Sequence, residues 1–506
     1  MQTKYLFRLI FPALILLLTA CDTDLALISS RPNLQEPSEG LMRGMLTTAY
    51  TTLTIDRSTY GYGLWGAING CDTDESFFKN TNTTGTDAIN TIGLHNCNST
   101  TTTHIQESWR AFYEIIEACN IVIEMSKDVP MNETIKTDLV GQAKAIRAFA
   151  HFMLAVHFGP VPIKNIPTHL MINLDLPRNS VKDVCTFALN ELRAATPMLN
   201  EITKTKTTTY MTKSVAEGLS LRVGLYLASH PDCQVTTMYD SVAVWGKQLI
   251  DRNVHSLNTT TFTAKGGSDI NETLPAYAQV FYNNMVNNVS TDKNKEAMWD
   301  CSFYMKSNIN GPYATWNNAY INWLGSYMGI DCLDPAYGTS KIGYATTQFR
   351  PQATLWTKYE AGDIRRDWNI STYAYKNTNN IRYNYINYTL PTAMITATTV
   401  PAKLLFVVKG DKLADETIIE NGGAGYKDGT YTDVVINGYN NGFVTGTPAY
   451  TPTTGTKFTI TVLGEKITDV KMQGTSATGY TNVYTRGIGK WRREYETNYT
   501  SPREQF

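Results

Sequence analysis

The 506-residue chain predicts a mainly α-helical fold, in which paired helices pack beside a loop-rich region and a small β module is inserted towards the C-terminal end. Three sequence patterns predict this arrangement. Residues 105–252 repeat apolar side chains every three or four positions, residues 50–104 and 253–400 have little periodicity, and residues 405–482 alternate polar and apolar side chains. The first spacing is that of helices and the last is that of strands.

The first twenty residues have the composition of a secretory signal peptide. Lys4 and Arg8 are basic, the run from Leu9 to Leu18 is almost entirely apolar, and small residues precede Cys21. That run is shorter than the roughly 20 residues that a membrane-spanning helix needs. The sequence before Cys21 resembles a bacterial lipobox, in which the cysteine sulfur is acylated, so we predict lipid attachment there. The alternative is a plain signal peptide with an incidental cysteine.

Two long helices are expected first in the helical region, each with one apolar stripe. The stripe of ESWRAFYEIIEACNIVIEM consists of Trp109, Phe112, Ile116, Cys119 and Ile123. The stripe of LVGQAKAIRAFAHFMLAVHF consists of Leu139, Ala143, Ile146, Phe149, Met153 and Val156. Gly159-Pro160 then predicts the end of the second helix.

Three further helices follow. Ser180 and Asp183 form a predicted N-terminal capping pair, before the buried positions Val181, Val184, Ala188, Leu192, Ala195 and Leu199. A fourth helix is expected to end before Pro231, and a fifth, from about Met238 to Asp251, to face inward with Tyr239, Val242, Gly246 and Leu249. The spacing of about 34 residues between Ser180 and Ser214 is the period of tetratricopeptide helix pairs, which predicts antiparallel pairs stacked side by side.

The β module is predicted from KFTITVLGEKITDVKM. Phe458, Ile460 and Val462 are expected on one side and Val470 and Met472 on another, with a two-residue hairpin turn at Gly464-Glu465. Two similar sequences flank this segment, GGAGYKDGTYT before it and SATGYTN after it.

Composition excludes several classes of function. The net charge of −1 gives no field that would attract nucleic acid. The seven cysteines after Cys21 contain no CxxC pair, so neither a metal site nor a cofactor is predicted. Cys119 and Cys185 are expected to be buried, while a disulfide among the remaining cysteines stays open. His151 and His157 are expected in the core or an interface, and Arg365-Arg366 with Asp363 and Asp367 could form an ion network or a solvated surface.

Several blocks together resemble the SusD/RagB family of Bacteroidetes lipoproteins. They are the lipobox at Cys21, WRAFYEIIEACNIVI, GQAKAIRAFAHFMLAVHFGPVPI, PRNSVKDVCTFALNELRAATPML, TKSVAEGLSLRVGLYLA, PQATLWTKYEAGDIRRDW and GIGKWRREY. They occur in the family's order across most of residues 21–400 and 483–506. Pro160 replaces a more usual acidic residue, the β module is not part of the family's common core, and the family usually continues beyond Phe506 with further helices.

The resemblance implies tetratricopeptide-like helical repeats packed against a loop-rich, ligand-binding half. The expected organisation is a signal peptide at 1–20, the binding domain at 21–404, the inserted module at 405–482 and a return to the binding domain at 483–506. It also implies a non-catalytic lipoprotein, held in the outer membrane and facing the cell exterior, that captures oligosaccharides and delivers them to a SusC-like TonB-dependent transporter. A peptide-capturing relative and a structural or adhesive surface lipoprotein are the alternatives.

Candidate ligand-binding residues come from two aromatic clusters, because sugars present apolar C–H faces that stack on rings and hydroxyl groups that bind amides and carboxylates. The denser cluster, GPYATWNNAYINWLGSYMGID, contains Trp316, Tyr320, Trp323 and Tyr327, although their helical spacing also fits a buried stripe. The second, YGYGLWGAINGCDTDESFF, contains Trp65, Asp72 and Asp74, and its alternative is a packed loop before a capped helix start. No pattern places two carboxylates across a sugar as a glycosidase requires.

Overall fold

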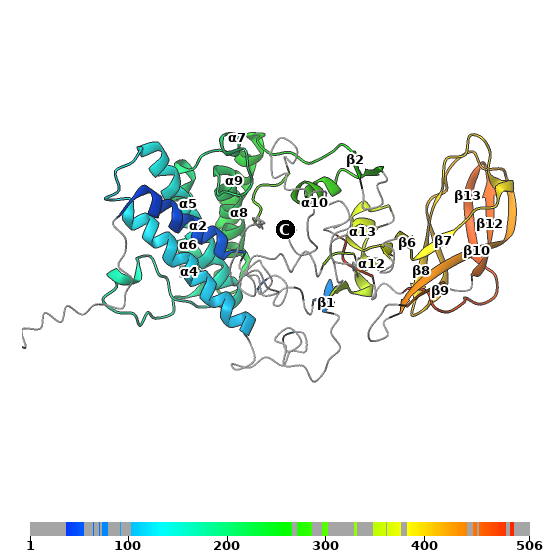
Figure 1. Cartoon of the computed structure of the whole chain (residues 1–506), viewed down its shortest axis with the longest axis horizontal. Coiled ribbons are helices and arrows are strands. Elements are labelled where there is room, and N and C mark those ends of the chain that lie inside the picture. The colour runs from blue at the N-terminus through cyan, green and yellow to red at the C-terminus, as the bar shows by residue number, and fades with distance from the viewer. Residues whose placement is uncertain are drawn as a thin grey trace, which may run out of the picture.

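The computed structural model describes residues 37–54, 64, 70, 73–78, 92, 103–265, 271–285, 296–301, 328–330, 348–360, 362–375, 382–442, 449–452, 455–481 and 486–489. Helices occupy one end of the molecule and the β module the other, with short helices and strands between them (Figure 1). The fold class predicted from the sequence is confirmed.

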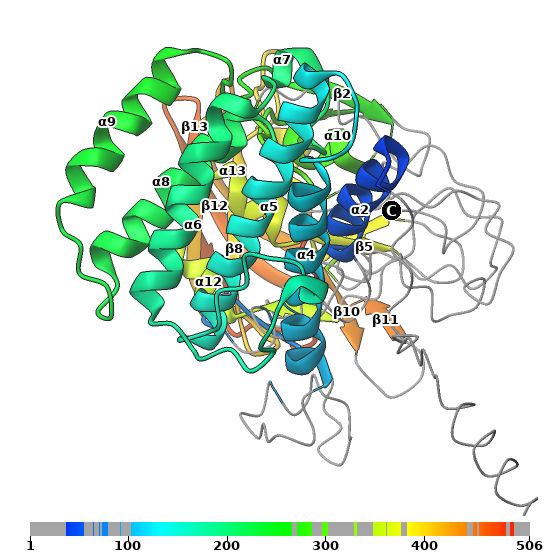
Figure 2. The ribbon, with the colours of Figure 1, turned by 90° about the vertical axis from the view of Figure 1, so that its left-hand side faces the viewer.

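The helical half is a sequential stack in which each long helix packs on the next one along the chain. Its members are α2 (Glu39–Thr52), α4 (Thr103–Met125), α5 (Glu133–Phe158), α6 (Val181–Ala195), α8 (Lys213–Ser229) and α9 (Met238–Asp251), with the single turn α7 (Ile202–Thr205) and the 3₁₀ turns η2 (Thr168–Leu170) and η3 (Thr196–Met198) between them. Figure 2 shows α6, α8 and α9 side by side. One apolar core runs through the whole stack.

The helix ends follow the local signals in the sequence. Asn132 caps α5 by accepting hydrogen bonds from the backbone of Thr134 (3.0 Å) and Ile135 (3.3 Å). Gly159, with φ +72°, ends α5 as predicted. The predicted capping pair is also confirmed, since Ser180 Oγ accepts from Asp183 N at 3.1 Å and donates to Asp183 Oδ2 at 2.6 Å.

Two predicted inward positions are wrong. Val156 is 38% exposed, because the continuous buried stretch of α5 ends with Ala155. Tyr239 is 48% exposed, because α9 is the outermost helix of the stack and, among its residues, only Val242 is buried. The approach of these two helices is close: a Cβ added at Gly224 would lie 2.6 Å from Val242 Cγ2.

The middle of the molecule is built from short elements. Its helices are α10 (Ala278–Met285), α12 (Ala353–Lys358) and α13 (Ile364–Asn369). Three antiparallel pairs of strands join β1 (Ser76–Phe78) to β4 (Phe349–Pro351), β2 (Phe262–Lys265) to β3 (Asn271–Leu274), and β5 (Tyr373–Tyr375) to β6 (Arg382–Asn384). The first of these pairs brings together segments that are far apart in the sequence.

The β module contains an antiparallel sheet in the order β11-β10-β12-β13, with β7 also on β10, and a separate β8–β9 hairpin. The strands are β7 (Ile386–Tyr388), β8 (Lys403–Lys409), β9 (Lys412–Asn421), β10 (Gly429–Gly442), β11 (Ala449–Pro452), β12 (Thr456–Leu463) and β13 (Lys466–Met472). They enclose an apolar core of their own. The module boundaries at 405 and 482 stay a prediction.

The predicted hairpin turn is confirmed, with φ +62° at Gly464 and +63° at Glu465. The prediction that Val470 and Met472 lie on a different side from Phe458 and Ile460 is wrong. Val470 pairs with Ile460 and Met472 with Phe458 across β12–β13. Because directly opposed residues of an antiparallel pair point to the same face, all four contribute to one core.

The module is internally duplicated. Residues 403–426 and 457–480 match at a constant spacing, with identical residues in the pairs Lys403/Lys457, Val408/Val462, Gly410/Gly464, Lys412/Lys466, Asp415/Asp469, Gly425/Gly479 and Tyr426/Tyr480. The hydrogen bonds of the two repeats are equivalent in the same way. Tyr426 N donates to Glu465 O (3.1 Å), and the equivalent Tyr480 N donates to Asp411 O (2.9 Å). Each repeat therefore closes on the hairpin turn of the other.

A buried ion cluster joins α13 to the β8–β9 hairpin. Arg366 forms an ion pair with Glu420, and both side chains are only 2% exposed. Lys403 Nζ lies 2.6 Å from Asp367 Oδ2 and 3.0 Å from Glu420 Oε2. Burial alone would raise the pKa of Glu420, but the hydrogen bonds from Lys403 and Arg366 outweigh it and lower the pKa. Of the predicted ion network, Arg366 and Asp367 belong to this cluster, whereas Arg365 pairs with Asp363 at the surface.

We expect Glu420→Gln to lower the free energy of unfolding by about 3 kcal/mol, because it removes one of the two carboxylates that pair with the buried Arg366 guanidinium and leaves Asp367 as the other. Urea unfolding at pH 7 measures this. Glu416→Gln, on the same strand, is the matched control, since Glu416 and Lys409 are exposed and 3.9 Å apart. Equal urea midpoints for the two variants would contradict a structural role for the cluster.

Candidate functional site

The structure describes one of the predicted ligand-binding residues. Asp74 lies among the described residues, whereas Trp65, Asp72, Trp316, Tyr320, Trp323 and Tyr327 lie outside them, as does the lipid-attachment residue Cys21. The assignments of these residues therefore stay predictions.

Asp74 is exposed at the tip of a tight turn that leads into β1. Thr73 Oγ1 accepts hydrogen bonds from Glu75 N (3.2 Å) and Ser76 N (3.0 Å). Gln352, next to β4, holds the turn from the other side, because its backbone N donates to Glu75 O (2.9 Å) and its Nε2 donates to Thr73 O (3.2 Å). Residues 73–78 thus form a turn and a strand rather than a helix start, and they present a free carboxylate in the middle of the molecule (Figure 1).

A second candidate surface is the loop between α5 and α6, residues 159–180, which the sequence patterns had marked only as a helix end. Polar side chains of α4 hold its first limb. Tyr113 Oη donates to Pro162 O (2.9 Å), and Asn120 Nδ2 donates to Lys164 O (3.2 Å) and Ile166 O (3.0 Å). Glu117 pairs with Lys164 Nζ at 2.5 Å and accepts from Thr168 N at 2.9 Å.

Arg147 of α5 ties this loop to both neighbouring helices. Its side chain is buried, and Nη1 donates to Asn120 Oδ1 of α4 (2.7 Å) and to Asn165 O of the loop (3.1 Å). Its Nε donates to Glu191 Oε2 of α6 at 3.1 Å, and Nη2 pairs with the same carboxylate. One guanidinium therefore fixes the positions of two helices and a loop.

His151, one helical turn further along α5, anchors the same limb. Its Nδ1 lies 2.9 Å from Arg147 O, and Lys164 N donates to its Nε2 at 3.1 Å. Because Nε2 accepts a hydrogen bond, the proton of the neutral ring must lie on Nδ1, which donates to the carbonyl. Burial lowers the pKa of His151 to about 4.

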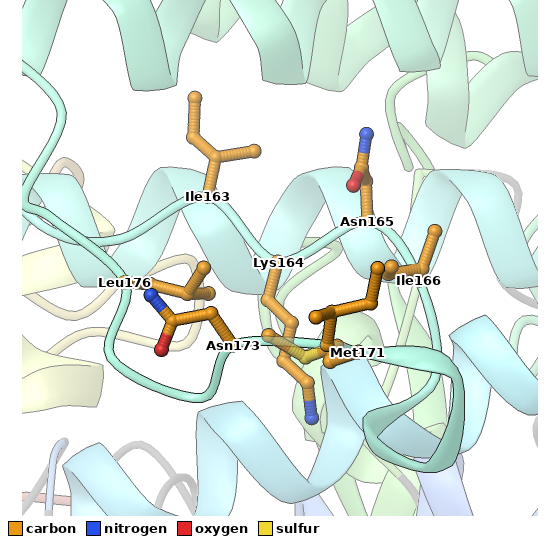
Figure 3. A pocket seen from close by; sticks show the side chains of 8 residues that line it. Ile163, Lys164, Asn165, Ile166, Met171, Asn173 and Leu176 are labelled. Carbon is orange, nitrogen blue, oxygen red and sulfur yellow. The ribbon is translucent and has the colours of Figure 1, made fainter.

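The tip of the loop is apolar and exposed. Ile166, Leu170 and Leu174 project into solvent, and Ile172 is fully exposed. Beside them is a pocket of about 150 Å³ lined by Ile163, Lys164, Asn165, Ile166, Met171, Ile172, Asn173 and Leu176. Figure 3 shows the two limbs running side by side, with Lys164 pointing towards the opposite limb. The lining contains no aromatic ring, so this is a surface for apolar contact rather than for sugar stacking.

Two negative findings apply to the described part of the chain. It contains no group of three or more His, Cys, Asp or Glu side chains placed to hold a metal ion. Within the same residues, no helix is both long enough and apolar enough to cross a membrane.

Comparisons with known proteins agree with the fold. A SusD-like family model, described as starch-binding and associating with the outer membrane, matches residues 47–225. A SusD-like protein of Bacteroides ovatus is 30% identical over 101 residues, which are 19% of this chain and 18% of that protein. Over residues 47–225 the chain is therefore similar to the SusD/RagB family.

Solved SusD-type structures extend the likeness in fold. A SusD homologue from Bacteroides thetaiotaomicron matches with a TM-score of 0.54 at 19% identity, over 68% of this chain and 60% of that one. Surface glycan-binding protein A from Bacteroides fluxus matches with a TM-score of 0.49 at 15% identity, over 66% of this chain and 64% of that one. This chain thus covers less than two thirds of each relative's length.

Within this SusD/RagB fold, the family-model match includes α4, α5, α6 and the loop at 159–180. The sequence patterns did not identify three anchors of that loop, Arg147, Glu117 and His151. Their only signal was a set of polar residues on helices that are otherwise almost fully buried.

The buried His151 predicts a loss of stability in mild acid. Its pKa is near 4 in the folded protein against an ordinary 6.5, so between these values the unfolded chain binds a proton that the folded chain does not. Its contribution is constant above pH 6.5 and falls by about 3 kcal/mol as the pH drops towards 4. Urea unfolding at pH 7, 6, 5 and 4 measures the slope.

His151→Gln keeps an acceptor near Lys164 N but does not titrate, so its stability should fall less with acid. His157→Gln is the comparison: burial lowers the pKa of His157 as well, but its ring is only partly buried, so this variant should flatten the slope less than His151→Gln. If wild type and His151→Gln lose stability in parallel, another group causes the acid sensitivity.

Proposed function

We propose that this chain is a cell-surface lipoprotein that captures oligosaccharides and delivers them to a SusC-like TonB-dependent transporter in the outer membrane. The observation that carries the proposal is the match of residues 47–225 to a starch-binding, outer-membrane family model. The signal-like N-terminus with Cys21 supports export and lipid anchoring. On this proposal the protein acts by binding, without catalysis.

The ligand would bind in the loop-rich middle of the molecule. We propose that Trp316, Tyr320, Trp323, Tyr327 and Trp65 supply stacking faces, and that Asp72 and Asp74 accept hydrogen bonds from sugar hydroxyls. The exposed carboxylate of Asp74, held in place by the β1–β4 pair, supports its role. An acceptor fixed before the ligand arrives loses little conformational entropy on binding.

The central test measures glycan binding both by purified protein and by intact cells. We expect purified wild type to be retarded in native gels that contain one member of a panel of plant, fungal and host glycans. Trp323→Ala should weaken that binding about tenfold, through loss of a stacking contact worth roughly 1.4 kcal/mol. Tyr239→Ala, which removes an exposed aromatic side chain from α9, is the matched control.

The anchor is tested in the same experiment. Cells that carry Cys21→Ser should lose binding of a fluorescent form of the glycan, although the variant protein recovered from the medium or periplasm still binds it. Retention of the variant on the cell surface would defeat the lipid-anchor part of the proposal. Tight binding of peptides with no response to any glycan would defeat the sugar part and favour a peptide-capturing protein.

The apolar tip of the 159–180 loop supports the transporter part of the proposal. Its exposed side chains follow a first limb that Asn120 and Arg147 hold by hydrogen bonds to its backbone, so contact with a partner would need little ordering of that limb. Within residues 163–176 the charged side chains are Lys164, which pairs with Glu117, and Asp175. Such a surface does not attract anionic lipid headgroups, and we assign it to contact with the transporter.

We expect the double substitution Ile172→Asp and Leu174→Asp to abolish co-purification of the transporter from detergent-solubilised outer membranes, because two carboxylates would be buried at the contact. Leu463→Asp, at a fully separate exposed apolar position on β12, is the control and should leave co-purification unchanged. Unchanged glycan binding verifies that the double variant is folded. Normal recovery of the transporter with that variant would rule out this loop as the contact.

A further inference from the structure

Tyr210 is an exposed aromatic residue at the boundary between the helical half and the loop-rich middle of the molecule. It lies in the segment 206–212 between α7 and α8, and its side chain is 46% exposed. Figure 1 shows both helices on the side of the helical half that faces the middle. Among the described residues, Tyr210 and Tyr239 are the most exposed aromatic side chains. Tyr239 belongs to the outermost helix α9, so of the two it is Tyr210 that adjoins the proposed binding region.

A segment of the loop-rich region is docked on the backbone next to Tyr210. Asp300 N donates to Thr208 O (2.9 Å), and Thr208 Oγ1 donates to Asp300 Oδ2 (2.7 Å). Beside them, the indole Nε1 of Trp299 donates to Thr209 O (3.2 Å). The surroundings of Tyr210 are therefore shared by the helical stack and by the region in which the ligand would bind.

The ring of Tyr210 is supported by the helical stack. It packs against the ring of Tyr50 on α2, with centroids 5.6 Å apart and the planes inclined at 73°. Tyr50 also fixes the neighbouring backbone, because its Oη accepts from Met211 N (2.8 Å) and donates to Gln142 Oε1 of α5 (2.7 Å). This contact leaves nearly half of the Tyr210 side chain exposed. A ring that is positioned before a ligand arrives loses little conformational entropy on binding.

The groups around Tyr210 are those that a pyranose sugar requires. The apolar C–H face of the sugar stacks on an aromatic ring, while the hydroxyl groups at its edge form hydrogen bonds. Thr207 and Thr209 precede the ring, with their Oγ1 atoms 2.9 Å apart, and the Asp300 carboxylate adjoins them through its bond to Thr208. The tip of the 159–180 loop lacks this combination, since the pocket there has no aromatic ring in its lining.

We propose that Tyr210 is a ligand-stacking residue, whose exposed ring takes the apolar face of one pyranose unit of the bound oligosaccharide beside the hydroxyl groups of Thr207 and Thr209. This inference rests on the proposed function, because it names a further contact with the same ligand. The contact belongs to the helical half, whereas the aromatic clusters predicted from the sequence belong to the loop-rich regions. The bound oligosaccharide would therefore span the boundary between the two.

Oxidative footprinting of the full-length wild-type protein tests the contact without a mutation. Hydroxyl radicals oxidise exposed tyrosine rings, and mass spectrometry of the digest reports each tyrosine separately. The probe is the glycan that retards the protein in native gels, from a panel that includes amylopectin and xyloglucan. We expect it to lower the oxidation of Tyr210 severalfold and to leave that of the equally exposed Tyr239 unchanged. Undiminished oxidation of Tyr210 with that glycan bound would overturn this inference alone, whereas retardation by no glycan would overturn it together with the proposed function.

Two substitutions separate ring stacking from other roles of Tyr210. Tyr210→Ala should weaken binding of that glycan about tenfold, the effect of losing one stacked ring. Tyr210→Phe, which keeps the ring, should restore most of the binding, and Tyr239→Ala is the matched control. Full glycan binding by Tyr210→Ala, including the case in which it fails to co-purify the transporter, would contradict the stacking role, as would equal losses with Ala and Phe. If Tyr210→Ala does not fold, as its urea midpoint would show, the footprint of wild type decides the question alone.

Discussion

The helical half depends on the charge of one side chain, Arg147. A guanidinium cannot lose its proton at any ordinary pH, and burying it without acceptors costs several kcal/mol. This side chain is 4% exposed, so its N–H groups need hydrogen-bond acceptors from the protein itself. They come from Asn120 on α4, Glu191 on α6 and the backbone of Asn165 in the loop between α5 and α6. The spacing of three elements around α5 is thereby set by one hydrogen-bonding requirement.

Apolar packing alone does not give this specificity. The buried residues of α5 include several alanines, whose small side chains allow the neighbouring helices to approach closely. Directional bonds to Arg147 and His151 fix the register, and they extend the order of the core outward into the first limb of the 159–180 loop. The exposed Ile172 at the tip of that loop therefore stands on a defined support.

The sequence predicted the helices well because their signals are local. Apolar spacing and the cap at Ser180 depend on residues within one or two turns. Val156 and Tyr239 were misplaced because periodicity shows which side chains share a face, but not how far the neighbouring helix extends or whether there is one. The pairing of Val470 with Ile460 likewise depends on hairpin register, which alternation within each strand does not reveal.

The polar features of the site were harder to predict, because their partners are distant in the sequence. In the sequence, Glu117 and Arg147 look like ordinary charges on a helix surface. Their partners Lys164 and Asn165 lie in a loop that only the fold brings next to them. Arg366 and Asp367 could be suspected of pairing, but the position of Glu420 on a strand of the inserted module could not. Asp74 was predicted from its aromatic and acidic neighbours in the sequence, and its assignment stays a prediction, while the turn that exposes it depends on Gln352.

The duplication in the β module explains how such an insertion can be accommodated. Tyr426 of the first repeat bonds to the turn of the second, and Tyr480 of the second bonds to the turn of the first. Each repeat thus supplies the acceptor for a buried backbone N–H of the other, which ties the two together. That unit has its own apolar core and, among the described residues, meets α13 through the charges around Arg366. The junction still depends on the host, because the buried carboxylate of Glu420 pairs with Arg366 of α13.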